Sequence, residues 1–191
     1  MKTSTLLRPL FLRGALGGLL LGAAAASAQV PGTELLEEES TALVQQTCFG
    51  MSPTITGSGT INGTEGNDVI IGSNRADTIN GNGGNDVICG AGGRDVISGG
   101  SGADTMSGGP ENDRLDGNGG KDLIIGGRDA DVLRGGVGDD ELRGGSDADD
   151  LDGEAGADKL KGGAGVDVCN GGANDPSQDT AEGCEFPSNI P

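Results

Sequence analysis

Apolar and polar residues alternate along most of this chain with a period of nine residues. From Ile70 to Cys169 an apolar residue stands at every ninth position, and an aspartate precedes each of them by two positions. A glycine stands five positions before each aspartate. The repeating unit is therefore G-x-x-G-x-D-x-U-x, where U is the apolar residue, and residues 81–89 show it as GNGGNDVIC.

This unit predicts a turn followed by a short strand. The glycine-rich half supplies positions that tolerate unusual backbone angles, and the D-x-U-x half alternates polar and apolar residues as a strand with one inward face does. Two units make one coil of 18 residues, so successive coils stack about 4.8 Å apart. We therefore predict an all-β fold, a parallel β-roll (solenoid) of twelve nonapeptide rows over residues 63–170, with small caps at both ends.

In such a roll the aspartates form two columns. Odd rows carry Asp68, Asp86, Asp104, Asp122, Asp140 and Asp158, and even rows carry Asp77, Asp95, Asp113, Asp131, Asp149 and Asp167. Carboxylates stacked at this spacing repel one another strongly unless cations lie between them. Carboxylate and carbonyl oxygens are the ligands that calcium prefers. We expect Ca²⁺ as the cofactor, up to about ten ions if every gap is filled, and a roll that folds only with calcium because its apolar core is small.

The repeat resembles that of the RTX family, whose glycine- and aspartate-rich nonapeptides wind into a calcium-filled parallel β-roll. The resemblance covers residues 63–170 and implies that all twelve aspartates are metal ligands. Members of that family often leave the cell through a C-terminal signal.

This chain instead has an N-terminal leader. Residues 1–28 read as a signal peptide, with a basic start, an apolar run from Gly14 to Ala26 and a small-residue site that predicts cleavage after Ala28. The alternative is an uncleaved membrane anchor, for which the run is short. We expect a secreted protein with no membrane span in the mature chain.

The flanks of the roll differ from it in composition. Residues 29–62 form an acidic segment and cap, in which Glu34 to Gln46 suits either a short helix or a solvated linker. Residues 54–62 fit the repeat as an additional row that keeps Ile61 but has Gly59 in place of aspartate, as a terminal cap would. Residues 171–191 begin another row and then lose the pattern, which predicts a C-terminal cap.

Four cysteines favour disulfides in an exported protein. In the predicted roll, Cys89 and Cys169 lie about 21 Å apart, and a disulfide allows only about 7 Å between Cα atoms. Because a Cys48–Cys169 bond would require a segment to cross the roll, we prefer Cys48 with Cys89 and Cys169 with Cys184. Free thiols remain the alternative.

The two preferred bonds have different surroundings. Cys89 points outward beside an apolar patch, which we expect the segment around Cys48 and Phe49 to cover. Cys169 takes the inward U position, where a bond to Cys184 would hold the cap over the open end.

The two columns also differ at the fourth position of the unit. Odd rows have glycine there throughout, whereas four even rows carry Arg75, Glu111, Asp129 and Asp147. Side chains at a turn position that favours glycine strain the turn. We therefore expect tighter calcium binding at Asp86, Asp104, Asp122 and Asp140, and the weakest binding around Asp77 and Asp113.

Charge and composition exclude several classes of function. Beyond residue 28, nine basic residues face thirty acidic ones, a net charge of −21, so nucleic acid and anionic membranes are poor partners. The chain has no histidine and no G-x-S-x-G motif, and we expect no enzyme. Two hypotheses remain: a secreted structural or surface-associated calcium-binding protein, or a recognition module that binds a cell-surface polysaccharide or protein.

Overall fold

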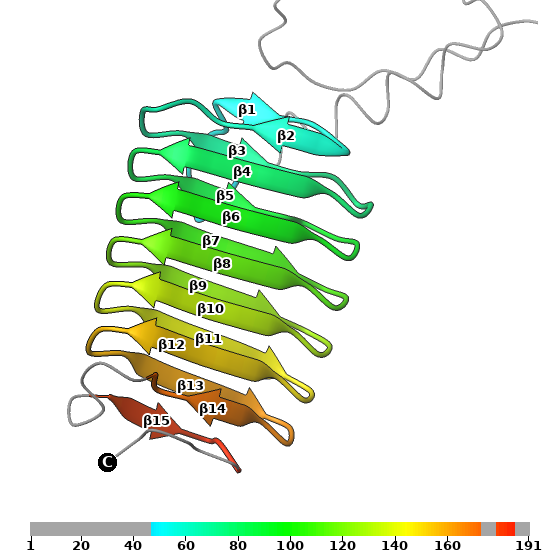
Figure 1. Ribbon diagram of the computed structural model, residues 1–191. Helices are drawn as coiled ribbons and strands as arrows, with labels where there is room; N and C mark the ends of the chain where they lie inside the picture. The colour runs from blue at the N-terminus through cyan, green and yellow to red at the C-terminus, as the bar shows by residue number, and fades with distance from the viewer. Residues whose placement is uncertain (1–46, 173–178, 186–191) are drawn as a thin grey trace, which may run out of the picture.

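The computed structural model describes residues 47–172 and 179–185, which form one flattened parallel β-solenoid (Figure 1). The described part contains fifteen strands and no helix. The strands are β1 (Ile55–Thr56), β2 (Thr60–Asn62), β3 (Val69–Ile71), β4 (Thr78–Gly83), β5 (Val87–Cys89), β6 (Val96–Ser101), β7 (Thr105–Gly109), β8 (Arg114–Gly119), β9 (Leu123–Gly127), β10 (Val132–Val137), β11 (Glu141–Ser146), β12 (Asp150–Ala155), β13 (Lys159–Ala164), β14 (Val168–Asn170) and β15 (Thr180–Glu182).

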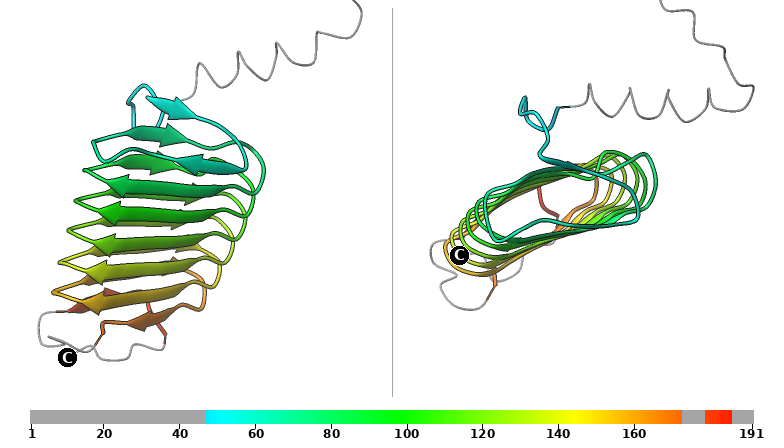
Figure 2. Two further views of the ribbon diagram at one scale, coloured as in Figure 1. Left: turned by 45° about the horizontal axis from the view of Figure 1, so that its top comes forward. Right: turned by 90° about the horizontal axis from the view of Figure 1, so that it is seen from above.

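The strands build two parallel sheets that face each other across the roll. The odd-numbered strands form an eight-stranded sheet from β1 to β15, and the even-numbered strands form a seven-stranded sheet from β2 to β14. Each strand of the repeat pairs with the strand one coil on, as Leu133 does with Leu115 and Leu151. Viewed along its axis, the roll is a narrow closed loop (Figure 2). The predicted all-β parallel roll is confirmed.

The U residues fill the space between the sheets. They form a single buried core in which most side chains have no exposed surface. Its members are Ile61, Ile70, Ile79, Ile88, Ile97, Met106, Leu115, Ile124, Leu133, Leu142, Leu151, Leu160 and Cys169. The nine-residue period therefore predicted the inward column correctly.

The N-terminal cap of the roll matches the expected additional row. Strand β2 pairs with β4, and Ile61 enters the core. Gly59 stands where an aspartate would be, and its N–H donates to the Oδ1 atom of Asp77. The predicted signal peptide at residues 1–28 and the expected helix or linker from Glu34 to Gln46 lie outside the described residues. No helix in the described ranges is long and apolar enough to cross a membrane.

Both expected disulfides are present. Cys48 bonds Cys89 and Cys169 bonds Cys184, each with a Cα–Cα distance of 5.8 Å. Cys89 is the register partner of Ile71, so the first bond lies beside Ile71, and both Ile71 and Cys48 are fully buried.

Cys184 packs against the end of the core, as expected for a bond that holds the cap. Phe49 does not help to cover the apolar patch beside Cys89, as had been expected of its segment. Its side chain is 46% exposed, because the chain turns at Phe49 and Gly50, both with positive φ, before Met51 pairs back with Cys48.

Candidate metal sites in the two aspartate columns

All twelve repeat aspartates lie inside the roll, at the two edges where the chain turns from one sheet into the other. None is more than 7% exposed. The odd-row residues precede strands of the eight-stranded sheet, and the even-row residues precede strands of the seven-stranded sheet. The structure therefore brings the predicted ligands together as two separate columns.

One carboxylate oxygen of each aspartate ties neighbouring coils together. The backbone N–H of each aspartate donates to the Oδ1 atom of the aspartate 18 residues later, at 2.7–3.0 Å, for all ten such pairs from Asp68–Asp86 to Asp149–Asp167. This ladder fixes the orientation of every carboxylate, so that the second oxygen, Oδ2, points at one repeated place in each coil.

In ten of the twelve aspartates that second oxygen has no partner. Their Oδ2 atoms are buried and make no hydrogen bond in the described structure: Asp86, Asp95, Asp104, Asp113, Asp122, Asp131, Asp140, Asp149, Asp158 and Asp167. A buried carboxylate oxygen without a partner is costly, since its hydration is lost and not replaced.

The first glycine of the unit has no side chain, which lets that oxygen approach the backbone closely. At Gly117, an added Cβ atom would lie 2.3 Å from Oδ2 of Asp122 and 2.5 Å from the carbonyl oxygen of Gly135. Gly81 has the same surroundings, with Asp86 Oδ2 and Gly99 O both at 2.3 Å from such an atom. Carboxylate and carbonyl oxygens thus lie close together against this glycine, and such a group of oxygens is what a hard cation prefers.

Comparison with known families gives the same interpretation. The model of the RTX calcium-binding nonapeptide repeat matches residues 62–97, 98–133, 116–151, 125–160 and 143–176, which is more than half of the chain. The chain belongs to the RTX family. No curated protein and no solved structure matches it.

RTX repeats bind calcium, and the residues present here fit that ion. No group of three or more Asp, Glu, Cys or His side chains gathers at one point in the described ranges. An ion between two coils would therefore take the remainder of its ligands from backbone carbonyls, which calcium, with six to eight oxygen ligands, accepts readily.

Burial makes these carboxylates hard to ionise without a cation. Loss of hydration, followed by charge repulsion from neighbouring aspartates, raises the pKa of Asp95, Asp122 and Asp131 to about 7. The pKa values of Asp113, Asp149 and Asp158 rise to about 6, mainly from burial. A bound cation inside the RTX roll would therefore favour the ionised form of these carboxylates.

The first coil of the RTX roll is different. Oδ2 of Asp68 accepts hydrogen bonds from the N–H and the hydroxyl of Thr64 at 2.7 and 2.8 Å, and Ser73 bonds Asp77 in the same way at 2.7 and 3.0 Å. The bond from the Thr64 N–H is the main reason that the pKa of Asp68 is lowered. These two aspartates have protein donors where the other ten have none.

The even-row turns follow the backbone path of their glycine counterparts. Glu111, Asp129 and Asp147 have φ of 76°, 66° and 74°, in the left-handed region that Gly93 adopts at 102°. Three of the four side chains therefore stand at left-handed backbone positions, whereas Arg75 does not have a positive φ. The weaker calcium binding expected at these rows stays a prediction. The second position of the unit is also left-handed at Asn82, Ala91, Asn118 and Glu154, which the sequence analysis missed.

Two acidic residues of the C-terminal cap were missed as well. Asp179 accepts the N–H of Asp158 at its Oδ1 atom at 2.9 Å, and Glu185 accepts the N–H of Asp167 at 2.5 Å. Both continue the ladder beyond the twelve rows. Glu185 stands 18 residues after Asp167, so the spacing could have revealed it, whereas Asp179 stands 21 residues after Asp158 and is out of register.

Proposed function

We propose that this RTX protein is secreted, that its roll folds on calcium, and that its role is structural or surface-associated. The observation that carries the proposal is the row of buried Oδ2 atoms without partners. Each such oxygen makes the metal-free roll unfavourable, because a buried charge needs compensation. Calcium supplies that charge, so folding and binding become one process.

The ligands in each coil would be the aspartate Oδ2 atom and the carbonyl oxygen that lies beside the first glycine of the unit. Asp122 with Gly135, and Asp86 with Gly99, are examples. If every gap between stacked aspartates of the repeat is used, about ten ions are held.

Export is supported by the leader at residues 1–28 and by the two disulfides, because such bonds persist in oxidising compartments. We propose no catalytic role, since the chain has no histidine to act as a general base.

The test is a calcium titration of the purified protein followed by circular dichroism, with magnesium at the same concentrations as the control. We expect a cooperative change from a disordered to a β-rich spectrum with calcium alone. A spectrum that is the same in chelator and in millimolar calcium would refute calcium-driven folding.

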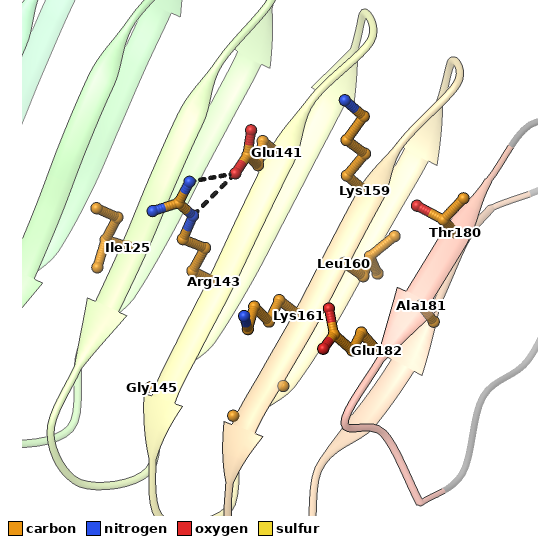
Figure 3. A pocket seen from close by; sticks show the side chains of 12 residues that line it. Ile125, Glu141, Arg143, Gly145, Lys159, Leu160, Lys161, Thr180, Ala181 and Glu182 are labelled. Carbon is orange, nitrogen blue, oxygen red and sulfur yellow. Dashed lines mark hydrogen bonds and ion pairs between the residues drawn. The ribbon is translucent and has the colours of Figure 1, made fainter.

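A second candidate, recognition of a cell-surface polysaccharide, is favoured by one region of the outer surface. A hollow of about 720 Å³ lies on the eight-stranded sheet over β9, β11, β13 and β15 (Figure 3). Arg143, Lys159 and Lys161 line it, and the Arg143 guanidinium pairs with Glu141. Neither lysine forms an ion pair with a residue of the described part. The two lysines on β13, and Ile125 two strands away on β9, suit the carboxylates and apolar faces of an acidic sugar polymer.

The two candidates differ in one measurement. If recognition is the role, a polymer of uronic acids binds the calcium-loaded protein saturably, and Lys159→Ala with Lys161→Ala weakens binding at least tenfold. Arg114→Ala with Arg134→Ala is the matched control, because it removes two positive charges from the other sheet, outside the hollow. Folding on calcium without a retained polymer favours the structural role.

A further inference from the structure

We propose that Asp179 is a calcium ligand, in a site shared with Asp158 that lies in the C-terminal cap. The match to the RTX repeat ends at residue 176, so this residue is outside the recognised sites. The proposal rests on the calcium-dependent folding proposed above and extends the odd-row column by one position.

The register of β15 brings Asp179 into the column. In the odd-row column, the aspartate one coil after Asp158 would stand at position 176, but this residue is Pro176. Strand β15 instead pairs with β13 through Lys159 with Thr180 and Leu160 with Ala181. This is an offset of 21 residues in place of 18, so three additional residues between Gly171 and Asp179 restore the D-x-U-x pattern as Asp179-Thr180-Ala181-Glu182.

Asp179 makes the same backbone contacts as the repeat aspartates. The N–H of Asp158 donates to its Oδ1 atom at 2.9 Å, as the N–H of Asp140 does to Asp158 at 2.9 Å. The N–H of Thr180 donates to the carbonyl of Asp158 at 2.9 Å, as that of Lys159 does to the carbonyl of Asp140 at 2.9 Å. One set of contacts therefore positions the carboxylates at 140, 158 and 179.

The second oxygen of Asp179 carries the inference. The residue is 2% exposed, and its Oδ2 atom is buried and has no hydrogen-bond partner within the described residues. The Oδ2 atom of Asp158 is in the same condition. Two adjacent buried carboxylates, each with one unpaired oxygen, repel each other unless a cation joins them.

A purely structural role would not need this charge. An asparagine at 179 could accept the same hydrogen bond from Asp158 through its amide oxygen and would remove the repulsion. The carboxylate is therefore explained by a bound cation and not by the ladder. In the even-row column Glu185 also accepts a ladder bond, but its side chain is exposed, so the proposal does not extend to it.

The site would hold the cap strand onto the roll. Ala181 and Cys184 pack against the end of the core, and the Cys169–Cys184 bond tethers the cap covalently. The tether limits how far β15 can move but does not set its register, whereas an ion between Asp158 and Asp179 would. Docking of β15 then depends on calcium even in the oxidised protein.

The test compares Asp179→Asn with Glu182→Gln, a matched loss of one negative charge at an exposed position of β15. Hydrogen exchange is followed at the peptide that contains the Thr180 and Glu185 amides and at a peptide of β7 to β9, across a calcium titration. With free calcium ten times the dissociation constant, one lost site lowers protection by about tenfold. We expect this loss at the cap peptide of Asp179→Asn alone, together with one ion fewer per chain by equilibrium dialysis.

The outcomes separate the two proposals. Equal cap protection and ion number in Asp179→Asn, Glu182→Gln and the unmodified protein would overturn the cap site while leaving calcium-driven folding intact. Protection that does not respond to calcium at either peptide of the unmodified protein would overturn the proposed function itself. Asp179→Asn should be at least as stable as the unmodified protein in chelator, and a lower stability there would show that the carboxylate has a structural role, which contradicts the cap site.

Discussion

The oxygens packed against the first glycine of each unit can be tested by adding a single methyl group there. Gly117→Ala places a Cβ atom 2.3 Å from Oδ2 of Asp122 and 2.5 Å from the carbonyl oxygen of Gly135. It changes no charge and removes no proposed ligand. Gly119→Ala is the matched control, because it adds the same methyl group to the same strand, β8, with no atom closer than 4.0 Å.

The expected cost has two parts. Forcing a methyl group into a filled interior costs about 1 to 3 kcal/mol. Losing one ion whose free concentration is ten times its dissociation constant costs about 1.4 kcal/mol more. We expect Gly117→Ala to lose about 2 to 4 kcal/mol of stability in calcium, or on the order of 10 °C in Tm for a domain of this size. Gly119→Ala should change stability by less than about 1 kcal/mol.

The assay is thermal unfolding by circular dichroism at a fixed free calcium concentration, with ion number measured by equilibrium dialysis. A calcium-bound roll should show one ion fewer for Gly117→Ala and none fewer for Gly119→Ala. If the two variants unfold together and bind equal numbers of ions, the oxygens packed against Gly117 are not part of a calcium site.

Three further predictions follow from the carboxylates and turns. In the absence of calcium, the pKa values of Asp95, Asp122 and Asp131 are raised from about 3.8 in the unfolded chain to about 7, so protonation of these carboxyl groups stabilises the roll. This contribution is complete below the unfolded pKa and is lost as pH rises through 7. The metal-free protein should therefore be more β-rich at pH 4.5 than at pH 8, and identical circular dichroism at both would contradict this. Glu111→Gly relieves a left-handed backbone (φ 76°) and should stabilise the roll by about 1 kcal/mol in urea unfolding, whereas no gain would show that the turn is unstrained. Because strain in a folded turn lowers apparent affinity, Asp104→Asn should raise the calcium midpoint more than Asp113→Asn, and the reverse order would show that the columns do not differ as the glycine pattern predicts.

The regular part of this structure could be predicted because one period fixes several properties at once. A spacing of nine residues without insertions places Leu133 in the core, Asp131 in a turn and the next coil in register. The same periodicity places Cys89 and Cys169 too far apart to bond. A Cys48–Cys169 bond would require a segment to cross the roll, so the pairs that the structure contains were preferred.

The features that were missed depend on breaks in the period or on local contacts. Three additional residues move Asp179 out of register, so spacing alone does not show that it joins the column. The hydrogen bonds from Thr64 and Ser73 depend on side-chain orientation, which the repeat pattern does not specify. The left-handed backbone of Ala91 and Glu154 comes from the stacking of coils, since neither residue favours that conformation by itself.

The hydroxyl-bonded first coil gives the roll a direction of growth. A solenoid extends by adding coils to a neighbour that is already formed. The first coil costs the most free energy to form because it has no folded neighbour to pack against. Here Thr64 and Ser73 satisfy the oxygens of Asp68 and Asp77, and the Cys48–Cys89 bond closes the first two odd rows. Under the proposed calcium-driven folding, the N-terminal end would form first, and each later coil would add together with its calcium. A chain that enters a calcium-rich space with its N-terminus first would meet these requirements in the order in which it folds.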